Sequence, residues 1–184
     1  MELSTIFEYE HKEDWETVST LYVELYQQNP SQDVAMHFAF FCWYLLWQWD
    51  EISFLGETLS PYEKATVDTR NGISKTELLS NLDLTTQYLL TSLENTPQKY
   101  LVLLSLMKKI YPYFFKEETF SEVDRKKLFV FISQRTQDDL GTKVIYNYLQ
   151  TQSTNNISPS EKVAVTNLFP KYSLIQSYFS WLFN

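Results

Sequence analysis

Glycine is scarce in this chain of 184 residues, which contains only Gly56, Gly72 and Gly141. Tight hairpins, phosphate-binding loops and dinucleotide motifs need glycine where the backbone takes a positive φ or passes close to a ligand. The shortage argues against the enzyme classes that depend on such loops. It also favours helices as the main structural element.

Cysteine occurs once, as Cys42, so the chain has neither a disulfide framework nor a cysteine-based metal site. This residue lies within an apolar, aromatic stretch, where a lone cysteine usually behaves as a small hydrophobic residue. We therefore expect no structural metal of this kind, and we predict that the protein works without a cofactor.

Basic residues are outnumbered, with 15 lysines and arginines against 23 acidic residues and a formal net charge of −8. Nucleic-acid affinity depends on lysine and arginine neutralising phosphates, so DNA and RNA are disfavoured as partners. The negative net charge is better suited to a partner that is a basic protein or peptide.

Uncharged stretches are too short for a membrane span. The longest candidate, from Val34 to Trp49, has 16 residues and includes His37 and Gln48, whereas a span needs about 20 apolar residues. The N-terminal residues begin acidic and lack the apolar core of a secretory signal. We expect a cytoplasmic protein that does not enter the membrane.

Aromatic residues, in contrast, are abundant at 17% of the chain and concentrate between Ser31 and Trp49. On a helix these rings would point to every side, which is the pattern of a helix surrounded by protein. The length of the chain suits one domain, residues 1–184, built around this segment. Its rings belong to Phe38, Phe40, Phe41, Trp43, Tyr44, Trp47 and Trp49.

Helix start signals recur along the chain, each followed by an apolar run with helical spacing. They are Ser60-Pro61-Tyr62-Glu63, Ser74-Lys75-Thr76-Glu77, Thr96-Pro97, Ser121 with Asp124, and Ser158-Pro159-Ser160-Glu161. Residues 143–150 are rich in β-branched and aromatic side chains and suit a strand, but no second strand candidate is near, so we favour a helix. These patterns predict an all-α protein made of antiparallel helical hairpins.

One part of the chain, Trp15 to Tyr44, resembles a piece of a tetratricopeptide (TPR) repeat array. The second helix of a repeat is matched by Trp15, Val18, Tyr22, Leu25, Tyr26 and Pro30, and the first helix of the next by Met36, Ala39 and Trp43. Phe40 departs from the family, which prefers a small residue there, and residues 52–64 fit the following helix poorly. Pro97 lies 67 residues after Pro30, close to two repeats of about 34 residues.

The resemblance implies hairpins stacked into a TPR-like bundle or short superhelix, whose curved surface binds peptides or partner helices. It also implies which face of the aromatic helix would line the groove. That face carries Val34, His37, Phe41, Tyr44 and Leu45. The alternative is that all five are core residues, because the helix is apolar all round.

Catalytic and metal-binding patterns are weak. His37 and Cys42 are five residues apart and point about 140° from each other on a helix, which makes a nucleophile and base pair implausible. Glu8, His11 and Glu13 could form a metal site, but a solvated charge cluster is the simpler interpretation.

Two further sets of charged residues give no sign of a catalytic or ligand-binding role. Asp138 and Asp139 precede a predicted helix, where acidic residues cap the positive end of the dipole. Arg70 and Arg135 are isolated in the sequence, which argues against an anion-binding cluster. We predict no catalytic residue and no bound metal.

These features together predict a non-enzymatic protein that binds another protein, such as an acidic immunity protein, inhibitor or adaptor. The alternative is a small-ligand-binding protein or enzyme with an aromatic pocket around Ser31 to Trp49. In that case Trp43 and Trp47 would form a wall suited to stacking.

Overall fold

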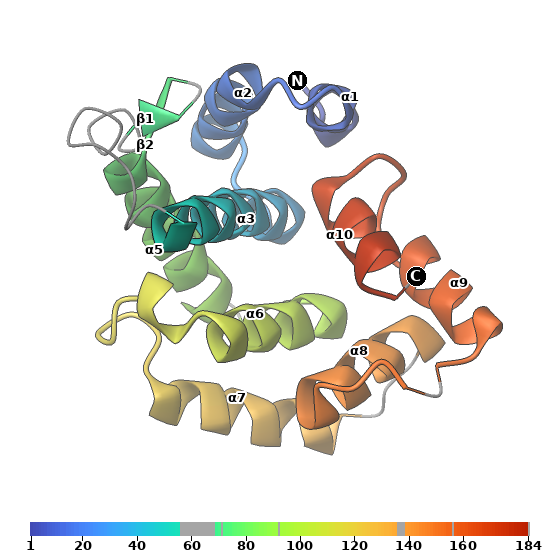
Figure 1. Ribbon diagram of the computed structural model, residues 1–184. Helices are drawn as coiled ribbons and strands as arrows, with labels where there is room; N and C mark the ends of the chain where they lie inside the picture. Colours follow the sequence, from blue (N-terminus) through green and yellow to red (C-terminus); the bar gives the residue numbers. More distant parts are fainter. Residues whose placement is uncertain (56–68, 71, 92, 136–138, 156, 184) are drawn as a thin grey trace.

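The computed structural model of the protein describes residues 1–55, 69–70, 72–91, 93–135, 139–155 and 157–183. Apart from one small hairpin, the elements in these ranges are helical, which confirms the all-α prediction (Figure 1). The helices are α1 (Leu3–His11), α2 (Trp15–Gln28), α3 (Gln32–Leu55), α5 (Lys75–Thr91), α6 (Gln98–Ile110), α7 (Glu122–Gln134), α8 (Leu140–Thr151), α9 (Pro159–Asn167) and α10 (Leu174–Leu182). A short 3-10 helix, η2 (Pro112–Phe114), follows α6.

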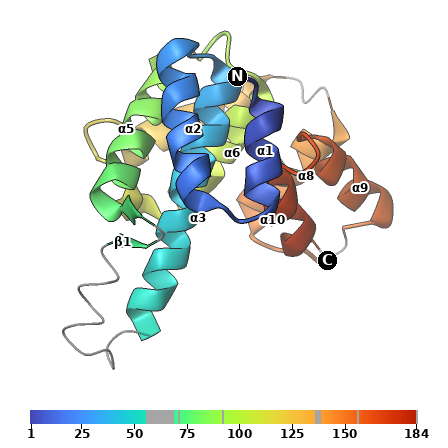
Figure 2. The ribbon, with the colours of Figure 1, turned by 90° about the horizontal axis from the view of Figure 1, so that it is seen from above.

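The helices form a bundle around α3, which passes through its middle (Figure 1). Helices α2, α5, α6 and α10 all pack against α3. The chain continues through α7, α8 and α9, and α10 then returns to contact both α3 and α1. Seen from above, α2 lies over α3 and α1 lies beside α10 (Figure 2). The first and last helices therefore close the bundle.

Most of the predicted helix starts are confirmed by their capping bonds. Complete capping boxes form at Ser121 and Ser158, and the Ser74 hydroxyl accepts the backbone N–H of Glu77 at 3.0 Å. Asp139 caps α8, since its Oδ1 accepts the backbone N–H of Thr142 at 2.6 Å. Each such bond satisfies a backbone donor that the helix itself leaves without a partner. The segment 143–150 lies within α8, so the helix prediction there is also confirmed.

The other two predicted start signals differ from these. At Thr96-Pro97 the proline itself occupies the position before α6, while the Thr96 hydroxyl donates to the carbonyl of Leu89 at 3.3 Å. Thr96 therefore also bonds back to the end of α5. The signal at residues 60–63 and the residue Asp138 lie outside the described residues.

A short β-hairpin, which was not predicted from the sequence, lies immediately before α5. Strands β1 (Thr69–Arg70) and β2 (Ile73–Ser74) pair antiparallel. Gly72 lies in the turn between the strands with φ of +74°, a conformation that residues with a Cβ rarely adopt. One of the few glycines is thus placed where the backbone needs it.

The centre of the core is the aromatic part of α3, as predicted. Phe38, Phe40, Phe41 and Trp43 are each at most 1% exposed. Tyr22 of α2 stacks on Phe38 with ring centroids 5.2 Å apart. Burial of each such side chain contributes roughly 1.5–3 kcal/mol, so this helix is a main source of stability.

Within the described residues, no helix is both long and apolar enough to pass through a membrane.

Candidate protein-binding surface

The five residues predicted to line a groove lie mostly in the interior. Val34, His37, Phe41 and Leu45 are at most 9% exposed, and Tyr44 is half-buried. The Phe41 ring lies 6.3 Å from Trp15 and 5.5 Å from Tyr22; His37 lies 4.8 Å from Phe7. Helices α1 and α2 thus cover this face of α3, and a partner could reach it only if those helices moved.

His37 and Cys42 have the properties of core residues. Burial is the main cause that lowers the pKa of His37 to about 3, so the imidazole is neutral at physiological pH. Burial also raises the pKa of the Cys42 thiol well above its usual value. An imidazole with so low a pKa is too weak a base to remove the proton of a thiol whose pKa is raised, so the pair is unsuited to act as a nucleophile and its base.

A buried carboxylate that sequence reasoning missed joins three helices. Glu10 of α1 is only 4% exposed. Its Oε1 accepts the hydroxyl of Tyr22 in α2 at 2.8 Å, and its Oε2 accepts the backbone N–H of Leu174 in α10 at 2.7 Å. Burial raises the pKa of Glu10 to about 7, and the two hydrogen bonds oppose that shift. The position of Glu10 in an acidic N-terminal segment gave no sign of this role.

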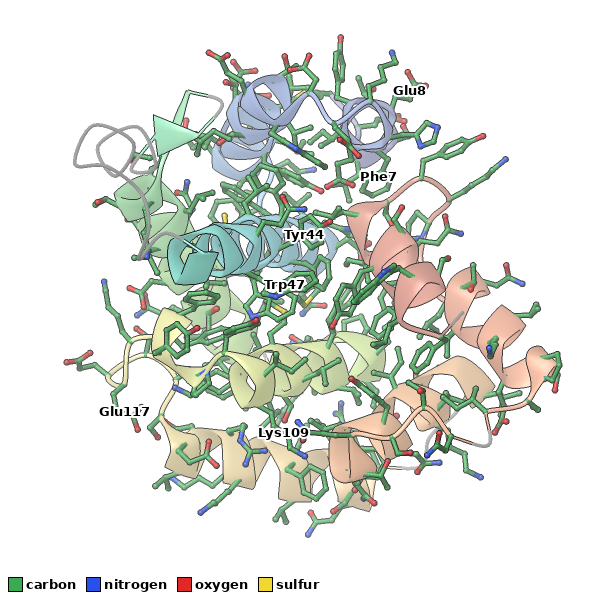
Figure 3. The ribbon with its side chains drawn as sticks, in the orientation of Figure 1. Phe7, Glu8, Tyr44, Trp47, Lys109 and Glu117 are labelled. Carbon is green, nitrogen blue, oxygen red and sulfur yellow. The ribbon has the colours of Figure 1, made fainter. Side chains whose placement is uncertain are left out.

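The possible metal ligands near the end of α1 are arranged as separate surface groups. The His11 ring lies 4.8 Å from that of Tyr172, and Glu8 lies on the outer side of α1 (Figure 3). Within the described ranges, no three histidine, cysteine, aspartate or glutamate side chains converge as metal ligands would. Of the two arginines that are isolated in the sequence, Arg135 lies over the Phe131 ring, with its guanidinium carbon 4.5 Å from the ring centroid. The side chain of Arg70 lies outside the described residues.

Acidic residues predominate in the first half of the chain and basic residues in the second, which the net charge of −8 does not show. Residues 1–98 contain 4 basic and 16 acidic residues, a net charge of −12, whereas residues 99–184 contain 11 and 7, a net charge of +4. The first half forms α1, α2, α3 and α5, and the second forms α6 to α10. In Figure 1, α1 and α2 lie at the top of the bundle and α7 and α8 at the bottom, while α3 and α6 adjoin in the middle. Counting charges by half would have found this signal.

Helices α1 and α2 present an acidic outer surface. Lys12 is the only lysine or arginine in residues 1–28. Among the described residues, ion pairs form only with carboxylates from Asp83 onward, so those of α1 and α2 are not neutralised by a cation. We call this set the acidic surface. Its exposed carboxylates belong to Glu2, Glu8, Glu13, Asp14, Glu16 and Glu24.

A groove of about 260 Å³ lies at the edge of the acidic surface, between α2, the hairpin and the first turn of α5. Its residues are Glu16, Ser19, Thr20, Val23, Glu24, Gly72, Ile73 and Glu77. Three carboxylates therefore surround a small apolar floor. A Cβ on Gly72 would lie 3.0 Å from the Glu16 carboxyl group, so glycine permits this close approach. Chemically, the groove suits a lysine or arginine side chain, because carboxylates bind these cations by charge-assisted hydrogen bonds.

Comparisons with known proteins found no relative of this chain. No protein-family model, no curated protein and no solved structure matches the chain. The resemblance to tetratricopeptide repeats therefore stays a prediction made from the sequence.

Proposed function

We propose that this protein is a non-enzymatic helical scaffold that binds a basic protein or peptide on its acidic surface. The observation that supports the proposal best is the set of exposed carboxylates on α1 and α2 that no cation neutralises within the described residues. Carboxylates gathered on one side of a molecule speed the encounter with a basic partner and select against acidic ones.

The groove supplies a place for a specific contact within that surface. An arginine of the partner would pair with Glu16 or Glu24, while its aliphatic stem would cover Val23 and Ile73. Such a contact suits a small immunity protein or inhibitor that captures a basic toxin domain, or an adaptor in the cytoplasm. In each case the activity is binding, and the stacked hairpins provide the rigid support.

The experiment is affinity capture from the native cell with charge-reversed controls. The double substitution Glu16→Lys and Glu24→Lys changes the groove, whereas Glu118→Lys changes an exposed carboxylate on the basic half. We expect wild type and Glu118→Lys to retain the same basic partner and the double variant to lose it. Affinity for the purified partner should fall at least about tenfold between about 50 and 500 mM salt, because exposed charges are screened. A partner that the double variant retains, or one whose binding ignores salt, contradicts the proposal.

A second candidate function concerns the aromatic residues that continue from α3 to the surface. Trp43 is buried, but Trp47 is half-buried and its ring lies 6.0 Å from that of Trp181, which is 65% exposed. Trp47 lies on the side of α3 that faces α6 (Figure 3). If the protein instead binds a small aromatic ligand, we propose that the ligand stacks on Trp47 and Trp181. Trp181→Ala should then abolish ligand-induced quenching of tryptophan fluorescence, and unchanged quenching would exclude the site.

A further inference from the structure

Helix α7 lies at the edge of the bundle, and few of its residues are buried. Of its residues, only Leu128 and Ile132 are buried, and α7 packs against α6. In contrast, Val123 is 60% and Val130 is 52% exposed. In Figure 1 this helix forms the lower border of the molecule. An amphipathic helix with exposed valines has apolar surface left for another contact.

A groove of about 430 Å³ runs between α7 and the ends of α6 and α8. Its floor is apolar and partly fixed, since the Phe129 ring stacks on Tyr146 with centroids 5.2 Å apart. Its residues are Lys109, Arg125, Lys126, Phe129, Val130, Leu149 and Gln150. We call it the α7 groove.

The rim of the α7 groove is positively charged. The Lys109 ammonium group donates to the carbonyls of Leu149 and Gln150 at the end of α8, and Figure 3 shows Lys109 between α6 and α7. Arg125 is paired with the Glu122 carboxylate. Within the described residues, neither Lys109 nor Lys126 forms an ion pair. These two positively charged side chains are therefore not neutralised by a carboxylate.

We propose that the α7 groove binds an acidic amphipathic helix of a partner protein. Leucine-like residues of that helix would cover Phe129 and Val130, and its flanking carboxylates would meet Lys109 and Lys126. This is the usual mode by which a helix fills an apolar groove, with the charges fixing orientation and partner. A second copy of this chain fits less well, because exposed residues of its acidic α2, such as Glu16, Thr20 and Glu24, are polar. The inference concerns the basic half and does not depend on the proposed function of the acidic surface.

The test uses the full-length protein and two labelled peptides of about 18 residues, five turns of helix. Both carry leucines at helical spacing, one flanked by glutamates and the other by lysines, and binding is followed by fluorescence anisotropy. Val130→Asp and Lys126→Glu change the α7 groove at exposed positions. Val163→Asp on α9 and Lys171→Glu, also exposed, are matched controls away from it.

The glutamate peptide should bind the wild-type protein, whereas any binding of the lysine peptide should be unchanged by Val130→Asp, because a basic peptide would bind the acidic surface instead. Each groove variant should weaken binding of the glutamate peptide about tenfold or more, and each control should change it by less than about twofold. Circular dichroism and urea unfolding confirm that every variant folds. The double variant Glu16→Lys and Glu24→Lys should bind the glutamate peptide as wild type does, which separates this site from the acidic surface.

Three outcomes would overturn the inference. The first is no binding of the glutamate peptide up to about 1 mM. The second is binding that Val130→Asp leaves unchanged. The third is a dimer, seen by sedimentation, that Val130→Asp dissociates, because the groove would then be covered by a second copy of the chain.

Discussion

Two buried titratable groups should give the stability of this protein an unusual dependence on pH. Burial raises the pKa of Glu10 from 4.5 to about 7, and it lowers the pKa of His37 from 6.5 to about 3. Both side chains are at most 4% exposed. A difference in pKa between the folded and unfolded chain makes the free energy of unfolding depend on pH.

The two groups act with opposite sign. Between pH 4.5 and about 7, folded Glu10 keeps a proton that the unfolded chain has lost, so its contribution to the free energy of unfolding falls as pH rises. Between about pH 3 and 6.5, unfolded His37 carries a proton that the folded chain lacks, so its contribution rises with pH. Each slope is about 1.4 kcal/mol per pH unit where one proton differs.

From pH 4.5 to 6.5 the two contributions therefore cancel in the wild type, and removal of one reveals the other. Glu10→Gln should become more stable relative to wild type as pH rises, by about 3 kcal/mol over this range. His37→Gln should become less stable by a similar amount. The lost packing and hydrogen bonds add a cost in each variant, but that cost does not vary with pH, so the slope is the informative quantity.

The measurement is urea unfolding of wild type and each variant at intervals from pH 4.5 to 6.5, followed by tryptophan fluorescence. Surface carboxylates contribute equally to all chains, so the difference from wild type isolates the buried groups. Glu8→Gln, an exposed change on the same helix, is the control and should keep the wild-type slope. If Glu10→Gln also keeps the wild-type slope, the carboxyl group does not titrate as its buried position requires, and the reasoning is refuted.

Three further predictions concern packing and capping, and urea unfolding at constant pH measures each of them. Trp43→Ala should lower the free energy of unfolding by about 3–5 kcal/mol, because it empties a large site in the core; a cost below about 1 kcal/mol would contradict the buried placement of this ring. Ser158→Ala should cost about 1 kcal/mol through loss of the capping box of α9, and no loss would mean that water replaces the bond. Gly141→Ala should cost roughly 1–3 kcal/mol, since its Cβ would lie 2.7 Å from the Ala164 carbonyl and push α8 from α9; a stabilised variant would contradict this contact.

The local features of the fold were predictable from the sequence. The capping boxes at Ser121 and Ser158 and the aromatic helix around Trp43 depend on residues within one or two turns of one another. The chain order displays such residues directly. The same reasoning found that α3 is surrounded by protein from Val34 to Leu46. It did not show which helices bury this segment, so the sequence left open whether Val34 and Phe41 line a groove or belong to the core, and the structure buries both.

The sequence by itself thus determined the helical class, most of the helix starts and the identity of the central helix. The closure of the bundle was decided only by the tertiary structure, because it depends on contacts such as that between Glu10 and Leu174, 164 residues apart. The tertiary structure alone likewise decided where the acidic surface and the α7 groove lie. Each combines side chains from separate helices, and helical periodicity states which residues share a face but not which faces meet.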